Sequence, residues 1–270
     1  MRKIKTMIVG TAMLALCAVT AQAEKIVVEG STTVLPIAQR AAELFMEKKP
    51  SADISVRGGG SGVGIASIID GTCDIADSSR PIKDTELDKA AALGKDIKAH
   101  IVAMDGIALI VHPSNGVSAL TKQQVKEIYT GKISNWSKLG GENKKIVVIS
   151  RDTSSGTFEA FGELALDKQK VRPDALMQAS NQAIASTVAK TPDAIGYVGL
   201  GFLDSSVKAL DIDGVTPSKE SVLTGKYVIG RPLFMYTNGA PKGMAKDFLD
   251  FIKSSEGQSM VEGEGFVPLE

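Results

Sequence analysis

The residues with the clearest chemical potential form one hydroxyl- and glycine-rich run at positions 150–157, with the sequence SRDTSSGT. The run follows the apolar segment 146–149 and precedes apolar residues at helical spacing, which predicts a strand, a loop and then a helix. Free N–H groups and the positive dipole end at the start of a helix attract anions. Arg151 adds a guanidinium whose planar fork suits a tetrahedral oxyanion. The run therefore predicts an anion-binding loop, although such clusters also serve as plain N-terminal caps.

Two loops of the same kind lie nearer the N-terminus, at residues 30–33 (GSTT) and 58–62 (GGGSG). Each follows a short apolar run that predicts a strand and precedes a segment that predicts an amphipathic helix. Glycines let the backbone approach a small ligand closely, although a flexible turn would also use them. Residues 58–62 lack the features of a Walker loop and the G-x-G-x-x-G spacing, so the sequence does not favour nucleotide binding. In chain order these are the first, second and third loops, the third being residues 150–157.

Residues 1–23 have the pattern of a secretory signal peptide, with basic residues first, an apolar run over 7–19, and Ala21-Gln22-Ala23 as a cleavage site. The apolar run is short for a membrane span, so we expect cleavage after Ala23 rather than a retained anchor. The mature chain would begin at Glu24 and be released into the periplasm.

The composition of the mature chain excludes several classes of function. Without Arg2, Lys3 and Lys5, three of the 31 basic residues are lost, and 28 remain against 31 acidic residues. This balance does not favour nucleic-acid binding, and no second long apolar run predicts a membrane domain. An anion site in such a chain must act through local geometry rather than through a general positive field.

The cysteine and histidine content predicts neither a disulfide nor a metal site. Cys73 is the only cysteine after the signal peptide, and its apolar surroundings predict a small buried side chain rather than a reactive thiol. His100 and His112 do not lie at metal-ligand spacing with Cys or Glu. We therefore expect no metal and no cofactor.

Strands and helices are predicted to alternate along the chain, which favours α/β sheets with mostly parallel strands. Asp105 and Gly106 interrupt the apolar runs 101–104 and 107–111, and a carboxylate within a buried extended segment is unusual. We interpret the first run as leaving one lobe and the second as entering another, with a surface turn as the alternative. Residues 233–236 predict a strand that returns. Lobe I would then comprise residues 24–104 and 231–270, and lobe II residues 105–230, with Trp136 as a packing anchor.

The loops together resemble those of the phosphate-binding protein of bacterial phosphate ABC transporters. The resemblance covers essentially the whole mature chain and rests on motifs in the family's order: GSTTVLP at 30–36, GGSG at 59–62, SRP at 79–81, RDTSSGT at 151–157 and AIGY at 194–197. It implies a periplasmic binding protein of the type II-like fold, in which each of two lobes is a mostly parallel sheet flanked by helices. Dehydrated phosphate would lie in the cleft between the lobes, which close like a hinge. The implied partners are inorganic phosphate and an ABC permease with its ATPase, and we expect a monomer.

The resemblance also implies which residues contact phosphate, as far as this sequence matches the family's motifs. The implied contacts are Thr32 and Thr33 in the first loop, Ser61 and Gly62 in the second, Ser79, and Arg151, Ser155, Gly156 and Thr157 in the third.

One position departs from the better-known members of the family, which carry an aspartate where this chain has Ser79. That aspartate accepts a hydrogen bond from the phosphate proton, and sulfate, which has no such proton, is rejected. We hypothesise that Asp105 is the acceptor here, because it lies at the predicted crossing between lobes. Asp152 and Asp77 are the alternatives, and we expect Asp152 instead to orient Arg151.

Other interpretations of the sequence remain at this stage. Arg80 is either a second cationic contact at the rim of the cleft or the partner of a nearby acid. The cleft could take another tetrahedral oxyanion, such as sulfate, molybdate or tungstate, and a phosphate sensor or adhesin would need the same loops. A phosphatase with Ser154 or Ser155 as nucleophile is disfavoured, because no histidine lies in the motifs to act as base.

Overall fold

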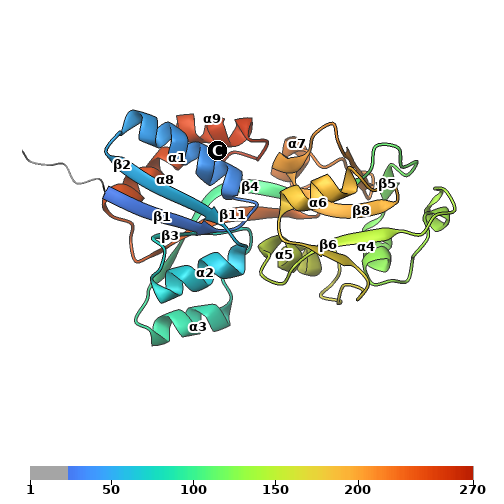
Figure 1. Ribbon diagram of the computed structural model, residues 1–270, viewed down its shortest axis with the longest axis horizontal. Helices are drawn as coiled ribbons and strands as arrows, with labels where there is room; N and C mark the ends of the chain where they lie inside the picture. The colour runs from blue at the N-terminus through green and yellow to red at the C-terminus, as the bar shows by residue number, and fades with distance from the viewer. Residues whose placement is uncertain (1–23, 270) are drawn as a thin grey trace, which may run out of the picture.

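The computed structural model describes residues 24–269, and it shows two α/β lobes side by side along the long axis (Figure 1). The predicted signal peptide, residues 1–23, lies outside the described part of the chain. None of the helices over the described residues is long and apolar enough to cross a bilayer.

Lobe I is a sheet covered by helices on both faces. Strands β2 and β3 each pair with β1 in parallel, as the alternation of strands and helices predicts. Helices α1, α8 and α9 cover one face and α2 and α3 the other (Figure 1), and the apolar sides of α1 and α8 share one core with the strands. The elements are β1 (Glu24–Gly30), α1 (Leu35–Lys48), β2 (Ala52–Gly58), α2 (Ser61–Asp70), β3 (Ile75–Ser78), α3 (Asp84–Ala92), α8 (Gly243–Lys253) and α9 (Ser255–Gly263).

Lobe II has a parallel core in which β6 pairs with both β7 and β8. Two further short strands, β5 and β10, pair with each other in a separate sheet. The elements are β5 (Ala119–Leu120), α4 (Lys122–Tyr129), η1 (Trp136–Leu139), β6 (Val147–Arg151), α5 (Gly156–Leu164), β7 (Leu176–Gln178), α6 (Asn181–Val188), β8 (Ala194–Gly199), η2 (Leu200–Phe202), β9 (Lys208–Ala209), β10 (Asp211–Ile212) and α7 (Lys219–Leu223).

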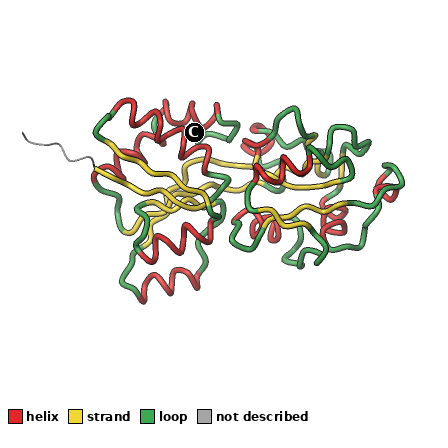
Figure 2. The backbone as a smooth tube through the Cα atoms, viewed as in Figure 1, coloured by secondary structure: helices red, strands yellow, loops and turns green. Residues whose placement is uncertain are grey.

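Two long strands, β4 (Ile97–Val111) and β11 (Gly230–Asn238), connect the lobes (Figure 2). They are antiparallel, with Asp105 opposite Arg231, and beyond Gly106 strand β4 pairs with β8 of lobe II. Within residues 24–269, one mixed sheet therefore runs through both lobes in the order β2-β1-β3-β11-β4-β8-β6-β7.

The sequence predicts a break at Asp105 and Gly106, but β4 is continuous through both residues. The surface-turn alternative is therefore wrong, since Asp105 is fully buried and its backbone is paired within the sheet. Strand β4 passes from one lobe to the other without interruption, and β11 begins at Gly230, opposite Gly106 at the crossing. The exact boundaries of the lobes, 24–104 with 231–270 and 105–230, stay a prediction.

Two predicted core residues are buried as expected. Trp136 is 2% exposed and its Nε1–H donates to Asp193 O over 3.0 Å, which ties a long connection of lobe II to the core. Cys73 is free and 7% exposed, and burial raises the pKa of its thiol to about 12. Because the thiolate is the reactive form, the raised pKa makes this cysteine a poor nucleophile.

Strand β3 carries a carboxyl group in an unusual place. Asp77 is fully buried, opposite Met235 of β11, and neither carboxyl oxygen has a hydrogen-bond partner among the described residues. Burial raises the pKa of Asp77 well above its ordinary value, which favours the uncharged form. A neutral carboxyl group is a poorer acceptor than a carboxylate, which weakens the case for Asp77 as the acceptor of a phosphate proton.

Asp77 should make the folded protein less stable as the pH rises. Because its pKa is raised on folding, the folded state holds a proton that the unfolded state releases, and each unit of that shift amounts to about 1.4 kcal/mol. We expect Asp77→Asn to gain melting temperature relative to the wild type as the pH rises above the ordinary Asp pKa of about 3.9. Calorimetric unfolding of both proteins measures this, with Asp53→Asn, exposed beside Lys25, as the control. A difference between Asp77→Asn and the wild type that is constant with pH would contradict the assignment.

Candidate functional site

The three polar loops meet where the two lobes face each other, a region that we call the seam. The first loop lies between β1 and α1, the second between β2 and α2, and the third between β6 and α5. Thr33 Oγ1 of lobe I and Thr157 Oγ1 of lobe II lie 2.9 Å apart. The Gly62 N–H donates to Ser154 O over 2.9 Å, also from lobe I to lobe II. The structure thus brings together three segments that resemble one another but are far apart in the sequence.

The first loop presents two threonine hydroxyl groups to lobe II. Ser31 Oγ accepts hydrogen bonds from the N–H groups of Thr33 and Val34, at 3.1 and 3.4 Å, so Ser31 orders the loop from within. Thr33 is fully buried. Asn181, at the start of α6, donates through Nδ2 to Thr33 Oγ1 over 2.9 Å and to Thr32 Oγ1 over 3.3 Å. Both threonines therefore face lobe II at the seam between the lobes.

The second loop places Ser61 beside Ser79. Ser61 Oγ accepts from the Ser79 N–H over 3.0 Å, and the two hydroxyl oxygens lie 3.3 Å apart. Both side chains are buried. Gly60 has φ +105°, and a Cβ there would lie 2.6 Å from Ser154 O across the seam. The glycine thus permits both the turn and the close approach of lobe II.

The third loop begins helix α5. Ser155 Oγ accepts from the Phe158 N–H over 3.2 Å, so Ser155 is an N-terminal cap. Capping was the alternative interpretation of residues 150–157. Gly156 touches the second loop so closely that a Cβ would lie 2.3 Å from Ser61 Oγ. Thr157 follows in the first turn with its hydroxyl on Thr33. Capping and a place at the seam are therefore combined in one loop.

Arg151 ends β6 with a buried charge. It is 1% exposed, and its Nε and Nη2 donate to the carbonyl oxygens of Gln178 and Ala179, at 3.1 and 3.0 Å. Its Nη1 has no hydrogen-bond partner within residues 24–269, and no carboxylate there forms an ion pair with it. Burial lowers the pKa of this guanidinium. A buried cation with an unused donor is costly unless an anion is supplied.

Asp152 does not orient Arg151 through a hydrogen bond, contrary to the sequence-based expectation. Its Oδ1 accepts from Ser154 N over 2.9 Å and from Ser154 Oγ over 2.5 Å. Asp152 thereby stabilises the third loop through a local Asx-type contact. This contact competes with a hydrogen bond from Arg151 to the same carboxylate.

Asp105 is part of a buried ion pair on the crossing strands. Its Oδ2 accepts from Arg231 Nη2 over 2.9 Å and from Arg231 Nε over 3.2 Å, and its Oδ1 accepts from the Leu200 N–H over 2.9 Å. Burial raises the pKa of Asp105, and the adjacent guanidinium and N–H group oppose that shift. Both carboxylate oxygens are therefore engaged by the protein itself.

Arg231 and Asn181 are site residues that the sequence analysis missed. Arg231 Nη2 donates to Thr157 Oγ1 over 3.0 Å and to Thr33 Oγ1 over 3.5 Å, and Nη1 donates to Ser79 O over 2.9 Å. The available signal was an arginine next to a proline at the start of an apolar strand. Asn181 follows the cap Ser180 and reads as an ordinary first helical residue.

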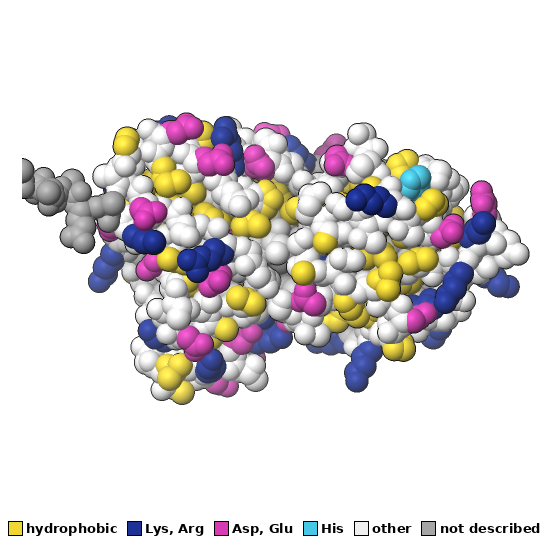
Figure 3. Space-filling view, in the orientation of Figure 1, with side chains coloured by type: hydrophobic (Ala, Val, Ile, Leu, Met, Phe, Trp, Pro, Cys, Tyr) yellow, Lys and Arg dark blue, Asp and Glu magenta, His cyan; other side chains and the backbone are white. Residues whose placement is uncertain are grey.

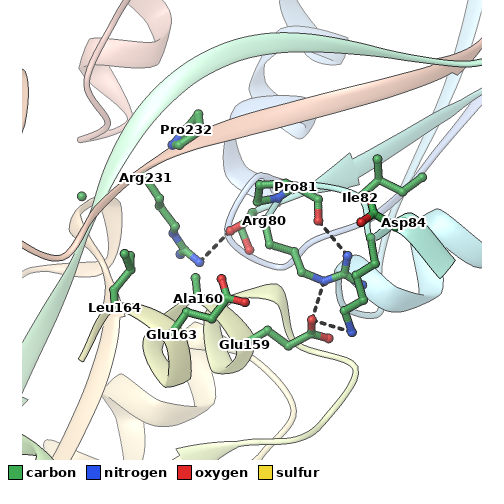
Figure 4. Close-up of a pocket in the computed structure, with 13 residues that line it drawn as sticks. Arg80, Pro81, Ile82, Asp84, Glu159, Ala160, Glu163, Leu164, Arg231 and Pro232 are labelled. Carbon is green, nitrogen blue, oxygen red and sulfur yellow. Dashed lines mark hydrogen bonds and ion pairs between the residues drawn. The ribbon is translucent and has the colours of Figure 1, made fainter. Parts of the chain in front are cut away.

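Arg80 is the partner of acids, which is the second of its two sequence-based interpretations. It forms two hydrogen bonds with Glu86, at 2.8 and 2.7 Å, within lobe I. Its Nε also lies 3.0 Å from Glu159 Oε2 on α5 of lobe II, and Lys83 Nζ lies 2.7 Å from the same oxygen. Figure 4 shows Arg80 and Glu159 facing each other beside the cavity.

The surface and the titratable groups are consistent with a site that acts locally. On the face shown in Figure 3, basic and acidic side chains are interspersed rather than gathered by sign. No cluster of three or more His, Cys, Asp or Glu residues within residues 24–269 is suited to hold a metal ion. The predicted site residues lie on or beside the three loops at the seam; they are Thr32, Thr33, Ser61, Gly62, Ser79, Asp105, Arg151, Ser155, Gly156 and Thr157.

The matches of this chain to a family model and to known proteins agree with one another. Residues 18–256 match the model of the PBP superfamily domain. The chain is 40% identical over 247 residues to the phosphate-binding protein PstS of Bacillus subtilis, covering 90% of this chain and 80% of the relative. It is 32% identical over 259 residues to PstS of Borreliella burgdorferi, covering 91% of both.

Solved structures agree with these sequence matches. A putative phosphate ABC transporter substrate-binding protein from Clostridium perfringens, solved with bound phosphate, superposes with a TM-score of 0.86 at 36% identity. The match covers 92% of this chain and 100% of that one. Because sequence similarity extends over nearly the whole described chain, this protein belongs to the PstS family of phosphate-binding proteins.

Proposed function

We propose that this protein captures inorganic phosphate in the periplasm and delivers it to an ABC permease and its ATPase. The observation that carries the proposal is the buried Arg151, whose Nη1 is unpartnered among the described residues at the seam where the three loops meet. The two lobes of the protein and its membership of the PstS family support the same role. The family is one of transport proteins, and we infer a binding function without catalysis.

The polar groups at the seam suit a phosphate oxygen and its proton. Ser61, Ser79, Thr33 and Thr157 are buried and neutral, and a hydroxyl group can either donate or accept a hydrogen bond. Donors held in place and out of water bind more strongly than the same donors in solution. Tight binding would therefore need few charges, which suits a chain with no basic excess.

Contacts between the lobes support hinge closure around the anion. Besides the threonine pair, Ser154 Oγ donates to Gly59 O over 3.1 Å. At the outer edge of the seam, Glu159 of lobe II lies against Arg80 and Lys83 of lobe I. In our proposal, the inner contacts enclose the anion and the ion pairs hold the edge shut, so release requires the lobes to part.

Specificity for phosphate is tested by titration of the mature chain, residues 24–270, freed of bound ligand. We expect phosphate to bind at least about 10⁴-fold more tightly than sulfate, because a site that accepts the phosphate proton leaves a partner unpaired with sulfate. Isothermal calorimetry near neutral pH measures both. Equal affinities would favour a general oxyanion carrier, and binding of neither anion would contradict the proposal.

Gly156→Ala tests whether closure is needed for binding. The added methyl group would lie 2.3 Å from Ser61 Oγ and 2.8 Å from Ser79 Oγ, and would keep the lobes apart. We expect phosphate affinity to fall about 10- to 100-fold, or about 1.4–2.8 kcal/mol, with little change in melting temperature. The matched control is Gly162→Ala on the same helix, where a Cβ meets nothing within 4 Å. Affinity equal to that of the control would count against closure at this contact.

Glu159→Gln tests the ion pairs at the edge. Loss of the contacts to Arg80 and Lys83 should speed phosphate release, lower affinity about 3- to 10-fold, and make release less sensitive to salt. Stopped-flow release at low and high ionic strength measures the effect. Glu163→Gln is the control, since Glu163 lines the same cavity but makes no ion pair among the described residues. Identical kinetics in both variants would show that the edge contacts do not govern release.

A further inference from the structure

We propose that Arg231 is a second cationic ligand of the bound anion, and that Asp105 holds Arg231 in place instead of accepting the phosphate proton. The inference rests on the proposed function and deepens it. It assigns the charge of the site to a strand that crosses between the lobes, rather than to the polar loops alone.

The position of Arg231 places its charge within the seam. The side chain leaves the crossing strand β11 and points towards α5 and the segment that carries Arg80 (Figure 4). It is 4% exposed. A cavity of about 490 Å³ is lined by both Arg231 and Ser79.

The neighbours of Arg231 are residues to which the family resemblance assigns phosphate contacts. Nη2 donates to Thr157 Oγ1 of lobe II over 3.0 Å and to Thr33 Oγ1 of lobe I over 3.5 Å. Nη1 donates to the carbonyl oxygen of Ser79 over 2.9 Å. An anion held by Thr33 and Thr157 would therefore lie next to this guanidinium, which can reach hydroxyl groups of both lobes at once.

The hydrogen bonds of the guanidinium leave capacity for a ligand. Of its five N–H donors, two point to Asp105, one to the Ser79 carbonyl and one to the threonine hydroxyl groups. One Nη1–H remains, and the bond to the threonines can be exchanged for a phosphate oxygen. A guanidinium fixed in this way by a carboxylate and a carbonyl is preorganised for a tetrahedral oxyanion.

The same geometry removes Asp105 from the role of acceptor. Its Oδ2 takes two N–H groups of Arg231 and its Oδ1 takes the Leu200 N–H, so both oxygens face the protein. Asp105 and Arg231 form a neutral pair, and Arg151 adds one net positive charge. Asp105 is thus a positioning residue, and the phosphate proton is left to another acceptor at the seam.

Variants of the mature chain separate these roles. Arg231→Gln should lower phosphate affinity at least about 100-fold, and Arg231→Lys, which keeps the charge without the fork, should lose less. The loss in Arg231→Gln should be larger at a pH where phosphate is mostly a dianion than where it is mostly a monoanion, because a direct Coulombic contact scales with ligand charge. Arg172→Gln, which breaks an arginine pair with Asp174 away from the seam, is the control.

Asp105→Asn distinguishes positioning from acceptance of the proton. If Asp105 positions Arg231, phosphate and sulfate affinities should change by similar factors and their ratio should persist. A ratio that collapses towards one would restore Asp105 as the acceptor and overturn this part of the inference.

A crystal structure with phosphate provides an independent measurement should Arg231→Gln fail to fold. We expect a guanidinium nitrogen of Arg231 within about 3.2 Å of a phosphate oxygen, and a separation beyond about 3.5 Å would overturn the inference. The inference would also be overturned if Arg231→Gln and Arg231→Lys bound phosphate as tightly as the wild-type protein. Wild-type protein that binds no oxyanion would instead refute the proposed function.

Discussion

The buried ion pair between Asp105 and Arg231 is the interaction on which the rest of the site depends. The two residues are opposite each other on β4 and β11, the strands that pass from one lobe to the other. A buried charge must be paired or solvated, so the carboxylate and the guanidinium fix each other. The guanidinium is thereby held against hydroxyl groups from both lobes. In the function we propose, the connecting strands contribute to the anion site as well as joining the two lobes.

The loops around this pair supply neutral donors at very short range. Gly60 lets its loop approach the backbone of Ser154, and Gly156 lets α5 approach the side chains of Ser61 and Ser79, at distances that a methyl group would prevent. Such contact excludes water, and a hydrogen bond without competing water is worth more than an exposed one. Residues 24–270 carry no excess of basic residues, so close approach and desolvation must do what a positive surface field does in other anion-binding proteins.

Sequence patterns with a local cause were interpreted correctly. Strand–loop–helix units follow from the period of apolar residues, and Ser155 caps α5 as its place before the helix predicts. Burial of Trp136 and Cys73 also follows from composition around each residue. The similarity of the three loops was visible because each repeats the same local solution, glycine and hydroxyl residues before a helix. The unusual carboxylate in an apolar run correctly marked Asp105 as a residue at the crossing.

Contacts between distant residues were decided only by the tertiary structure. Asp105 pairs with a residue 126 positions away, and Arg80 reaches Glu159 on the other lobe, so no periodicity links the members of either pair. Asp152 failed to reach Arg151 because a local bond to Ser154 was available. The sequence by itself determined which segments have the features of an anion-binding loop, since helix starts, glycines and hydroxyl groups act over a few residues. Which charges meet there depended on strand register and on the approach of two lobes, and these arise from packing across the whole chain.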